Sequence, residues 1–127
     1  GAGEMGDSLP YVNLGTSRTA TSIQAMLDGY CVILDNNATK CWGFNDNGQL
    51  GAGVFTSQNL GDSSNEMGDD LAAINLGTSR YATQLTSSRS FKHVCAILDN
   101  GTTKCWGRNA SGEVNSKFNL GDDTGEM

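Results

Sequence analysis

The sequence predicts an all-β protein made of two tandem copies of one unit, each pinned by a disulfide. Three observations support this: an internal repeat, a hairpin signal that recurs once in each copy, and two cysteines on each hairpin. Leu, Ile, Val and Phe together supply 24 of the 127 residues, which is few for one compact core. They cluster at repeated positions and the net charge is only −6, so disorder is the weaker interpretation.

The repeat is defined by four pairs of matching segments, offset by 60 to 64 residues. They are residues 9–18 with 71–80, 31–36 with 95–100, 39–43 with 103–107, and 59–62 with 119–122. A Glu-Met pair also occurs three times, beginning at Glu4, Glu66 and Glu126. We therefore divide the chain into a first unit, residues 1–70, and a second, 71–127. Because the sequence begins and ends inside the same motif, we expect further repeats beside it, or other copies of the chain in their place.

Each unit contains a predicted hairpin. In the second copy, Asp-Asn-Gly at 99–101 separates two β-prone runs, which is a strong hairpin signal. A three-residue loop with Gly101 in the left-handed region pairs Leu98 with Thr102 and places Cys95 opposite Cys105. These cysteines form a non-hydrogen-bonded pair, with Cα atoms roughly 4.5 Å apart. A two-residue loop would instead put the sulfurs on opposite faces.

In the first copy Asn37 takes the glycine position, since Asn is the next most tolerant residue there. The same count then pairs Cys31 with Cys41. Two disulfides indicate an oxidising location: extracellular, at the cell surface, or another oxidising lumen. Four buried thiols in a cytosolic protein are the alternative. Zinc fits less well, because the spacing lacks short ligand pairs and the chain has one histidine.

Three Asn-x-Ser/Thr triplets agree with an oxidising, secretory location. They begin at Asn37, Asn100 and Asn109, and the first two lie on the predicted hairpin tips. Such triplets are acceptors for N-glycosylation where the machinery is present. We list these three asparagines as possible glycosylation sites of a secreted glycoprotein.

The run Cys-Ala-Ile-Leu-Asp-Asn-Gly-Thr-Thr-Lys-Cys-Trp-Gly-Arg-Asn-Ala-Ser-Gly at 95–112 resembles the repeat of the regulator of chromosome condensation family. The first copy fits as well, through Trp-Gly-Phe-Asn at 42–45 and Asn-Gly-Gln-Leu-Gly at 47–51, whereas the second departs from the pattern at 113–115. The resemblance implies two four-stranded antiparallel blades of a β-propeller, commonly seven-bladed, with cysteine pairs like those of its secreted or surface branch. Two blades cannot close a propeller, which needs about four to eight. This chain would thus be a fragment, or other chains would complete it.

The residues that could support chemistry have simpler structural roles. His93, immediately before a predicted core strand, is expected to be structural, and Asp35 and Asp99 are expected to bond their own turns. Trp42 and Trp106 are expected to be repeated blade-core residues. The acidic loops at 61–70 and 121–126 could bind Ca²⁺, but their spacing does not match an EF-hand. We predict no catalytic residue, no metal site and no cofactor.

The leading functional prediction is a non-catalytic scaffold for protein partners or for self-assembly through its repeat faces. The acidic pI near 4.4, with no clustered cations, argues against nucleic acid as a partner. The longest apolar run, residues 30–34, argues against direct membrane insertion. The alternative is a carbohydrate- or Ca²⁺-dependent recognition module. An enzyme would need residues from further repeats.

Overall fold

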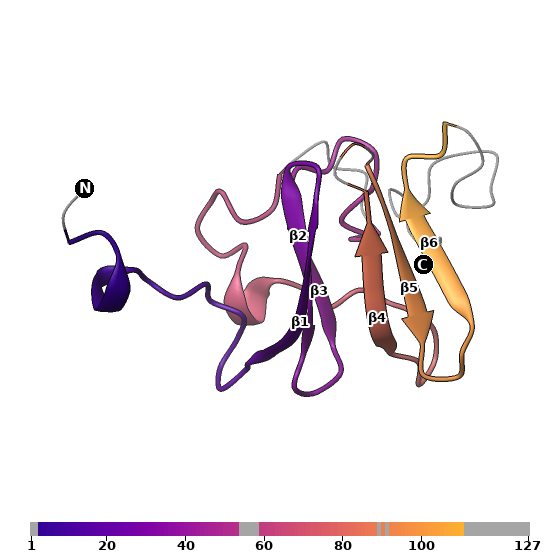
Figure 1. Cartoon of the computed structure of the whole chain (residues 1–127), viewed down its shortest axis with the longest axis horizontal. Helices are drawn as coiled ribbons and strands as arrows, with labels where there is room; N and C mark the ends of the chain where they lie inside the picture. The colour runs from indigo at the N-terminus through magenta and orange to yellow at the C-terminus, as the bar shows by residue number, and fades with distance from the viewer. Residues whose placement is uncertain (1–2, 54–58, 89, 91, 111–127) are drawn as a thin grey trace.

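The computed structural model describes residues 3–53, 59–88, 90 and 92–110. These residues form two antiparallel sheets of three strands each, which lie beside one another (Figure 1). The elements, in chain order, are η1 (Gly6–Ser8), β1 (Ala20–Met26), β2 (Gly29–Leu34), β3 (Thr39–Gly43), η2 (Gly68–Asp70), β4 (Ala82–Ser87), β5 (His93–Leu98) and β6 (Thr103–Gly107). The two η elements are single 3₁₀ turns, and the described part of the chain has no α-helix. The all-β prediction is confirmed, with sheets of the kind that form propeller blades.

The two hairpins have the predicted register. In the second sheet, Ile97 pairs with Thr103 and Cys95 with Cys105, and Gly101 has φ of +82°. In the first sheet the positive φ falls on Asn37, at +67°. The turn residues select a three-residue loop, and each cysteine then lies three residues beyond the closing pair Leu98 and Thr102, so the two are directly opposed and both sulfurs lie on one face.

Both cysteine pairs are joined. A disulfide links Cys31 to Cys41 and another links Cys95 to Cys105, with Cα separations of 4.1 Å and 4.0 Å. Each disulfide stabilises the fold by about 2 to 3 kcal/mol, because it restricts the conformational freedom of the unfolded chain. This compensates in part for the small core that each three-stranded unit can build.

The core lies between the two sheets and draws on opposite faces of equivalent strands. The first sheet contributes Cys31 and Ile33, whereas the second contributes the alternate positions Val94 and Ala96. Trp106 belongs to the same cluster and is 0% exposed. Each unit therefore packs one face against the opposite face of its neighbour, which is a head-to-tail contact.

The expected fourth strand is absent from the described part of the first sheet. Among the described residues, the outer edge of β3 is hydrogen-bonded at two points: Gly43 exchanges both backbone bonds with Leu60, at 2.8 and 2.9 Å, and Thr39 accepts from the Ile74 amide at 2.8 Å. The intervening residues, 61–73, leave the sheet and include η2. These residues form a loop, and residues 54–58, which precede the Leu60 bridge, lie outside the described residues. The corresponding residues of the second repeat, with the departure at 113–115, lie outside the described residues.

The glycine at the end of β3 sets the path of the chain there, and we expect Gly43→Ala to lower the free energy of unfolding by about 2 kcal/mol. Gly43 has φ of +117°, and an added Cβ would stand 2.4 Å from the Asp28 carbonyl oxygen. Gly101→Ala is the matched control, because its φ is +82° but nothing lies within 4 Å. The control should cost about 1 kcal/mol. Urea unfolding measures both; equal losses would contradict the predicted backbone clash.

Candidate interaction site

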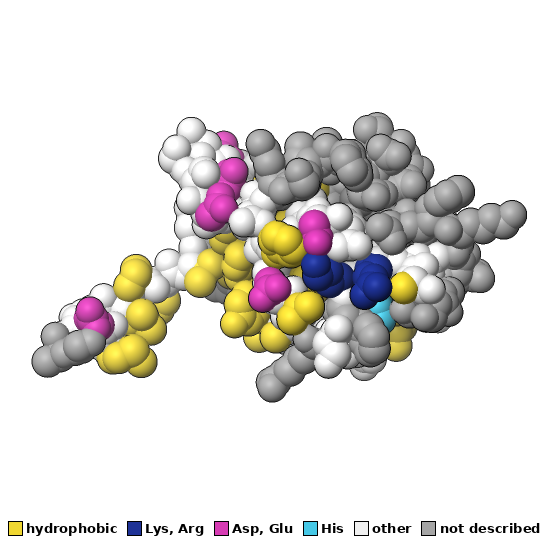
Figure 2. All heavy atoms as spheres, turned by 90° about the horizontal axis from the view of Figure 1, so that it is seen from above, with side chains coloured by type: hydrophobic (Ala, Val, Ile, Leu, Met, Phe, Trp, Pro, Cys, Tyr) yellow, Lys and Arg dark blue, Asp and Glu magenta, His cyan; other side chains and the backbone are white. Residues whose placement is uncertain are grey.

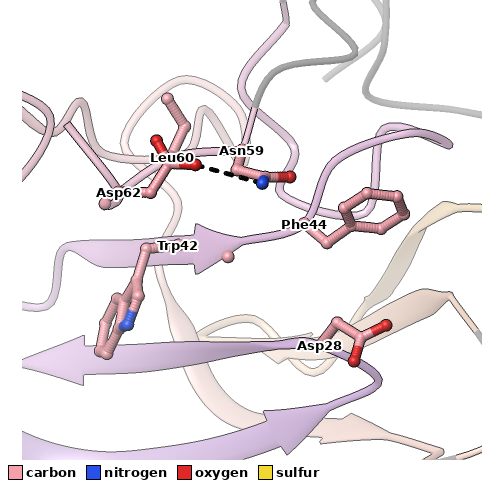
Figure 3. Close-up of a pocket in the computed structure, with 8 residues that line it drawn as sticks. Asp28, Trp42, Phe44, Asn59, Leu60 and Asp62 are labelled. Atoms are coloured by element: carbon pink, nitrogen blue, oxygen red, sulfur yellow. Dashed lines mark hydrogen bonds between the residues drawn. The ribbon is translucent and has the colours of Figure 1, made fainter.

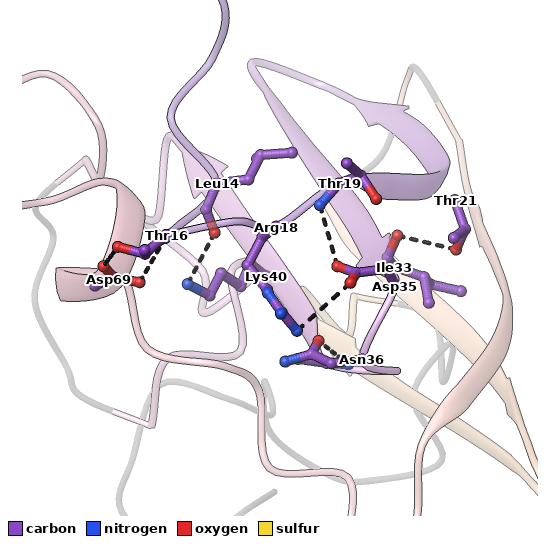
Figure 4. Close-up of polar contacts among 11 residues, drawn as sticks. Leu14, Thr16, Arg18, Thr19, Thr21, Ile33, Asp35, Asn36, Lys40 and Asp69 are labelled. Atoms are coloured by element: carbon purple, nitrogen blue, oxygen red, sulfur yellow. Dashed lines mark hydrogen bonds and ion pairs between the residues drawn. The ribbon is translucent and has the colours of Figure 1, made fainter.

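The segment that leads from the first unit into the second, η2, makes a polar contact with the loop at residues 13–18 of the first unit (Figure 4). The Asp69 carboxylate accepts a hydrogen bond from the Thr16 amide at 2.9 Å and a second from the Thr16 hydroxyl. Beside it, the Gly68 amide donates to the Asn13 carbonyl at 3.0 Å. The segment just before the second unit is thus hydrogen-bonded to a loop that precedes the first sheet.

Lys40 in β3 also takes part in this contact. Its side chain is buried, and Nζ donates to the Leu14 carbonyl at 3.2 Å and to the Gly68 carbonyl at 2.6 Å. One carbonyl precedes the first sheet and the other lies in the segment that leads to the second sheet, so the ammonium group links these two segments. Hydrogen bonds from the Thr16 side chain and backbone lower the pKa of Asp69, with the charges of Lys40 and Arg18 acting in the same direction. The carboxylate is therefore held ionised.

A second contact between the repeats lies around Asp46, in the loop after β3. Lys92, just before β5, places Nζ 2.6 Å from the Asp46 carboxylate and 4.7 Å from the centre of the Phe44 ring. Burial alone would raise the pKa of Asp46, but hydrogen bonds from Lys92, Asn47 and Gln49 outweigh it and lower the pKa. Residues of both repeats thus share this charged pair.

The expected role of Asp35 and Asp99 is wrong in one respect. Asp35 does not bond its own turn: it accepts from the Thr19 amide at 3.1 Å and pairs with Arg18 at 3.6 Å. Asp99 makes the equivalent two contacts in the second repeat, at 3.2 and 3.0 Å. The turn is bonded instead by the next residue, Asn36. Each aspartate instead bonds the segment that enters its sheet. That segment lies 16 or more residues away in the sequence, so the local pattern around the aspartate does not predict the contact.

His93 and the acidic loop are parts of the fold. His93 is half-buried at the start of β5, opposite Gly107. In the acidic loop, Glu66 folds back and one carboxylate oxygen accepts from three successive amides, those of residues 61–63, at 3.0 to 3.2 Å. Within residues 3–53, 59–88, 90 and 92–110, no three His, Cys, Asp or Glu side chains gather as a metal site. The acidic residues at 121–126 lie outside that range.

The two tryptophans have different surroundings. Trp106 is fully buried and donates from Nε1 to the Gln49 carbonyl at 3.1 Å. Trp42 is half-buried and lines an open cleft of about 330 Å³. Figure 3 shows it with Asp28 and Asn59 around this cleft. The two tryptophans occupy equivalent positions, but the one in the second repeat lies in the core and the one in the first lines a cleft.

The three predicted sequons occupy two kinds of position. Asn37 and Asn100 are exposed at the hairpin tips, whereas Asn109 is half-buried after β6. The Asn100 side-chain oxygen accepts from the Thr102 hydroxyl at 2.7 Å. No helix among the described residues is long and apolar enough to cross a membrane.

The fold and contacts define a class: paired antiparallel blades of propeller type, joined through loops. No protein-family model matches the sequence, and no curated protein does. Among solved structures, the chain is similar to a chain in the crystal structure of Kap60 bound to yeast RCC1 (Prp20). Sequence identity is 21%, the TM-score is 0.51, and the match covers 73% of this chain. This chain spans 20% of that chain, so the likeness shows the fold alone.

Sequence reasoning missed the contact of Asp69 with Thr16 and the buried Lys40. A signal was present: the 62-residue offset extends back through residues 4–9, so Gly-Asp follows Glu-Met in both copies. Repetition of a polar loop motif in a chain with a small core indicates a contact between repeats. It does not indicate which loop receives the motif.

Proposed function

We propose that this chain is a non-catalytic propeller-repeat scaffold that mediates protein–protein interaction or structural assembly in an oxidising compartment. The observation that carries the proposal is the contact across the repeats, in which Trp106 of the second unit is fully buried and donates to the Gln49 carbonyl of the first at 3.1 Å. Each unit can thus pack one sheet face against one neighbour and the opposite face against another. The similar solved structure is a complex between two proteins, which supports a protein partner.

The cysteine pairs support the oxidising location. Neither disulfide would persist in a reducing cytosol unless continuously reformed. Intact mass without reductant should fall below the reduced mass by about 2 Da per bond, because each disulfide forms with loss of two hydrogens. Glycans on Asn37 and Asn100 are part of the proposal; both lie at hairpin tips, away from the sheet faces that pack. A chain with four free thiols would argue against this compartment.

A second candidate function, carbohydrate recognition, is favoured by the cleft at Trp42. An aromatic side chain with carboxylate and amide groups beside it, here Asp28 and Asn59, can stack on a sugar ring and bind its hydroxyls. The cleft is open to solvent. Glycan binding abolished by Trp42→Ala would support this candidate.

A photo-crosslinking experiment tests the scaffold proposal. A photoreactive amino acid replaces Ile97, which is 40% exposed on the outer face of the second sheet, and in a matched control replaces Asn36 at a hairpin tip. After irradiation in the producing cells, we expect polypeptide adducts from position 97 but not from position 36. A glycan array and Ca²⁺ calorimetry should show no binding. Absence of adducts at both positions, with glycan or Ca²⁺ binding, would replace the scaffold with the recognition module.

A further inference from the structure

The N-terminal segment, residues 4–12, projects away from the sheets (Figure 1). Its hydrophobic side chains are open to solvent: Met5 is 72%, Leu9 51%, Tyr11 99% and Val12 56% exposed. Figure 2 shows hydrophobic side chains along the projecting segment. A run of apolar side chains held in water indicates a surface that functions against a partner.

The equivalent segment of the repeat is docked within the chain, against residues 13–16 and β3. Residues 66–74 match residues 4–12 at the 62-residue offset, and there Leu71 is 4% exposed where Leu9 is 51% exposed. The residues before the two 3₁₀ turns, Met5 and Met67, have the same backbone angles, φ −121° and ψ 173°. The free segment therefore already has the local conformation of the docked one.

The second repeat carries a copy of the receiving loop. In residues 75–80, the Gly77 amide bonds the Asn75 side chain at 3.0 Å, as the Gly15 amide bonds Asn13 at 3.1 Å in the first repeat. A Cβ built on Gly77 would lie 3.6 Å from Lys104 Nζ, and a Cβ built on Gly15 would lie at the same distance from Lys40 Nζ. The donors of the first site are thus reproduced in the second.

Among the residues that the structure describes, none bonds the side chains of this second receiving loop as η2 bonds the first. Thr78 and Lys104, the equivalents of Thr16 and Lys40, are exposed and have no polar partner among the described residues. Asp7, the equivalent of Asp69, is likewise exposed and has no such partner there. A matched anion and a matched set of donors therefore stand apart in one molecule.

We propose that the N-terminal segment of one copy docks on the second repeat of another copy. Asp7 accepts hydrogen bonds from the Thr78 amide and hydroxyl, Lys104 donates to the Gly6 carbonyl, and the Val12 amide extends the edge of β6. Each contact reproduces one seen within the chain, where Asp69, Lys40 and Ile74 make it. The inference rests on the proposed scaffold function and names its partner as a second copy of this chain.

The sheet faces agree with this arrangement. Ile33 is 5% exposed because its face is covered by the second sheet, whereas the equivalent Ile97 is 40% exposed. A groove of about 250 Å³ runs over this outer face and is lined in part by Gln84, Cys95 and Ile97. Docking the segment would bring the first sheet of the incoming copy over this groove. Lys104 and Arg80 would meet the negative charge of Asp7.

The contact is heterologous, so copies can add head to tail until a ring closes. Propellers close with about four to eight blades, which corresponds to about two to four copies of a two-blade chain. Sedimentation of the purified chain over a concentration series should show assemblies in this range. The free chain has a mass of 13.4 kDa.

Two variants that disable opposite sides of the contact test the proposal. Asp7→Asn removes the anion, and Thr78→Val removes a donor; each should weaken association about tenfold or more. Mixed in equal amounts, they should form a heterodimer, because one variant keeps a good loop and the other a good segment. Asp70→Asn is the matched control, since it removes the same charge from an exposed residue of η2. The control should associate like the unmodified chain.

Three results would overturn the inference: an unmodified chain that stays monomeric at all concentrations, Asp7→Asn that associates normally, or a mixture that forms no heterodimer. The scaffold proposal fails differently. If crosslinks from position 97 reach other proteins while the purified chain is monomeric, the scaffold stands and self-docking is wrong. If position 97 gives no polypeptide adducts, the scaffold itself is wrong.

Discussion

Trp106→Ala is expected to lower the free energy of unfolding by about 3 to 5 kcal/mol, a loss comparable to the whole stability of a small domain. Trp106 is 0% exposed, and its Nε1 donates to the Gln49 carbonyl across the repeats. A Cβ added to Gly51 would lie 2.9 Å from the same nitrogen, so the first repeat encloses the ring closely. Truncation would leave a cavity between the two units. Urea unfolding followed by circular dichroism measures the loss.

Two further variants separate the contributions to this loss. Trp106→Phe keeps most of the ring but leaves the Gln49 carbonyl without its donor, which costs about 1 to 3 kcal/mol. Trp42→Ala is the positional control, because Trp42 is the half-buried equivalent in the first repeat. It should cost clearly less than Trp106→Ala. Equal losses of unfolding free energy at the two tryptophans would mean that the interface between repeats is not the main source of stability.

The hairpins could be predicted from the sequence because their geometry depends on neighbours in the chain. A glycine or asparagine that accepts positive φ fixes the loop length, and the two-residue periodicity of a strand then fixes which side chains face each other. Cys95 therefore had to face Cys105 once Gly101 ended the turn. No distant residue enters that count.

The fourth strand could not be settled in the same way. Leu60 and Ile74 each bond the outer edge of β3, but the 13 residues between them form a loop rather than a strand. That loop is held by nonlocal bonds, such as the one that the Thr16 amide donates to Asp69, 53 residues away. Whether a segment pairs with an edge or leaves it depends on such contacts, which local pattern does not encode.

The difference between Trp42 and Trp106 has the same origin. Their sequence neighbourhoods are nearly identical, Thr-Lys-Cys-Trp-Gly in both, and this favours a shared core role. Burial depends on what lies across the face: Trp106 meets the first repeat, whereas Trp42 meets solvent. In a repeat protein, position within the array decides burial as much as residue type does.

The two disulfides should contribute unequally to stability although they close loops of the same length. Both join cysteines 10 residues apart, so each adds about 2 to 3 kcal/mol by restricting the unfolded chain. Cys31 and Cys41 are also 0% and 2% exposed in the core, whereas Cys95 and Cys105 are half-buried on an outer face. Replacing the first pair with alanine should cost about 1 to 2 kcal/mol more, because only there does a cavity form.

The matched double-alanine variants, one for each hairpin, make this comparison directly by urea unfolding. A second measurement uses the unmodified chain: dithiothreitol should reduce the pair Cys95 and Cys105 first, since a thiolate can approach sulfurs on an open face. Mass mapping of alkylated peptides during reduction gives the order. Equal costs, or earlier reduction of the pair Cys31 and Cys41, would mean that the first pair is not covered by the second sheet in solution. Self-docking would add a further effect, because an incoming copy covers Cys95 and slows its reduction at high protein concentration.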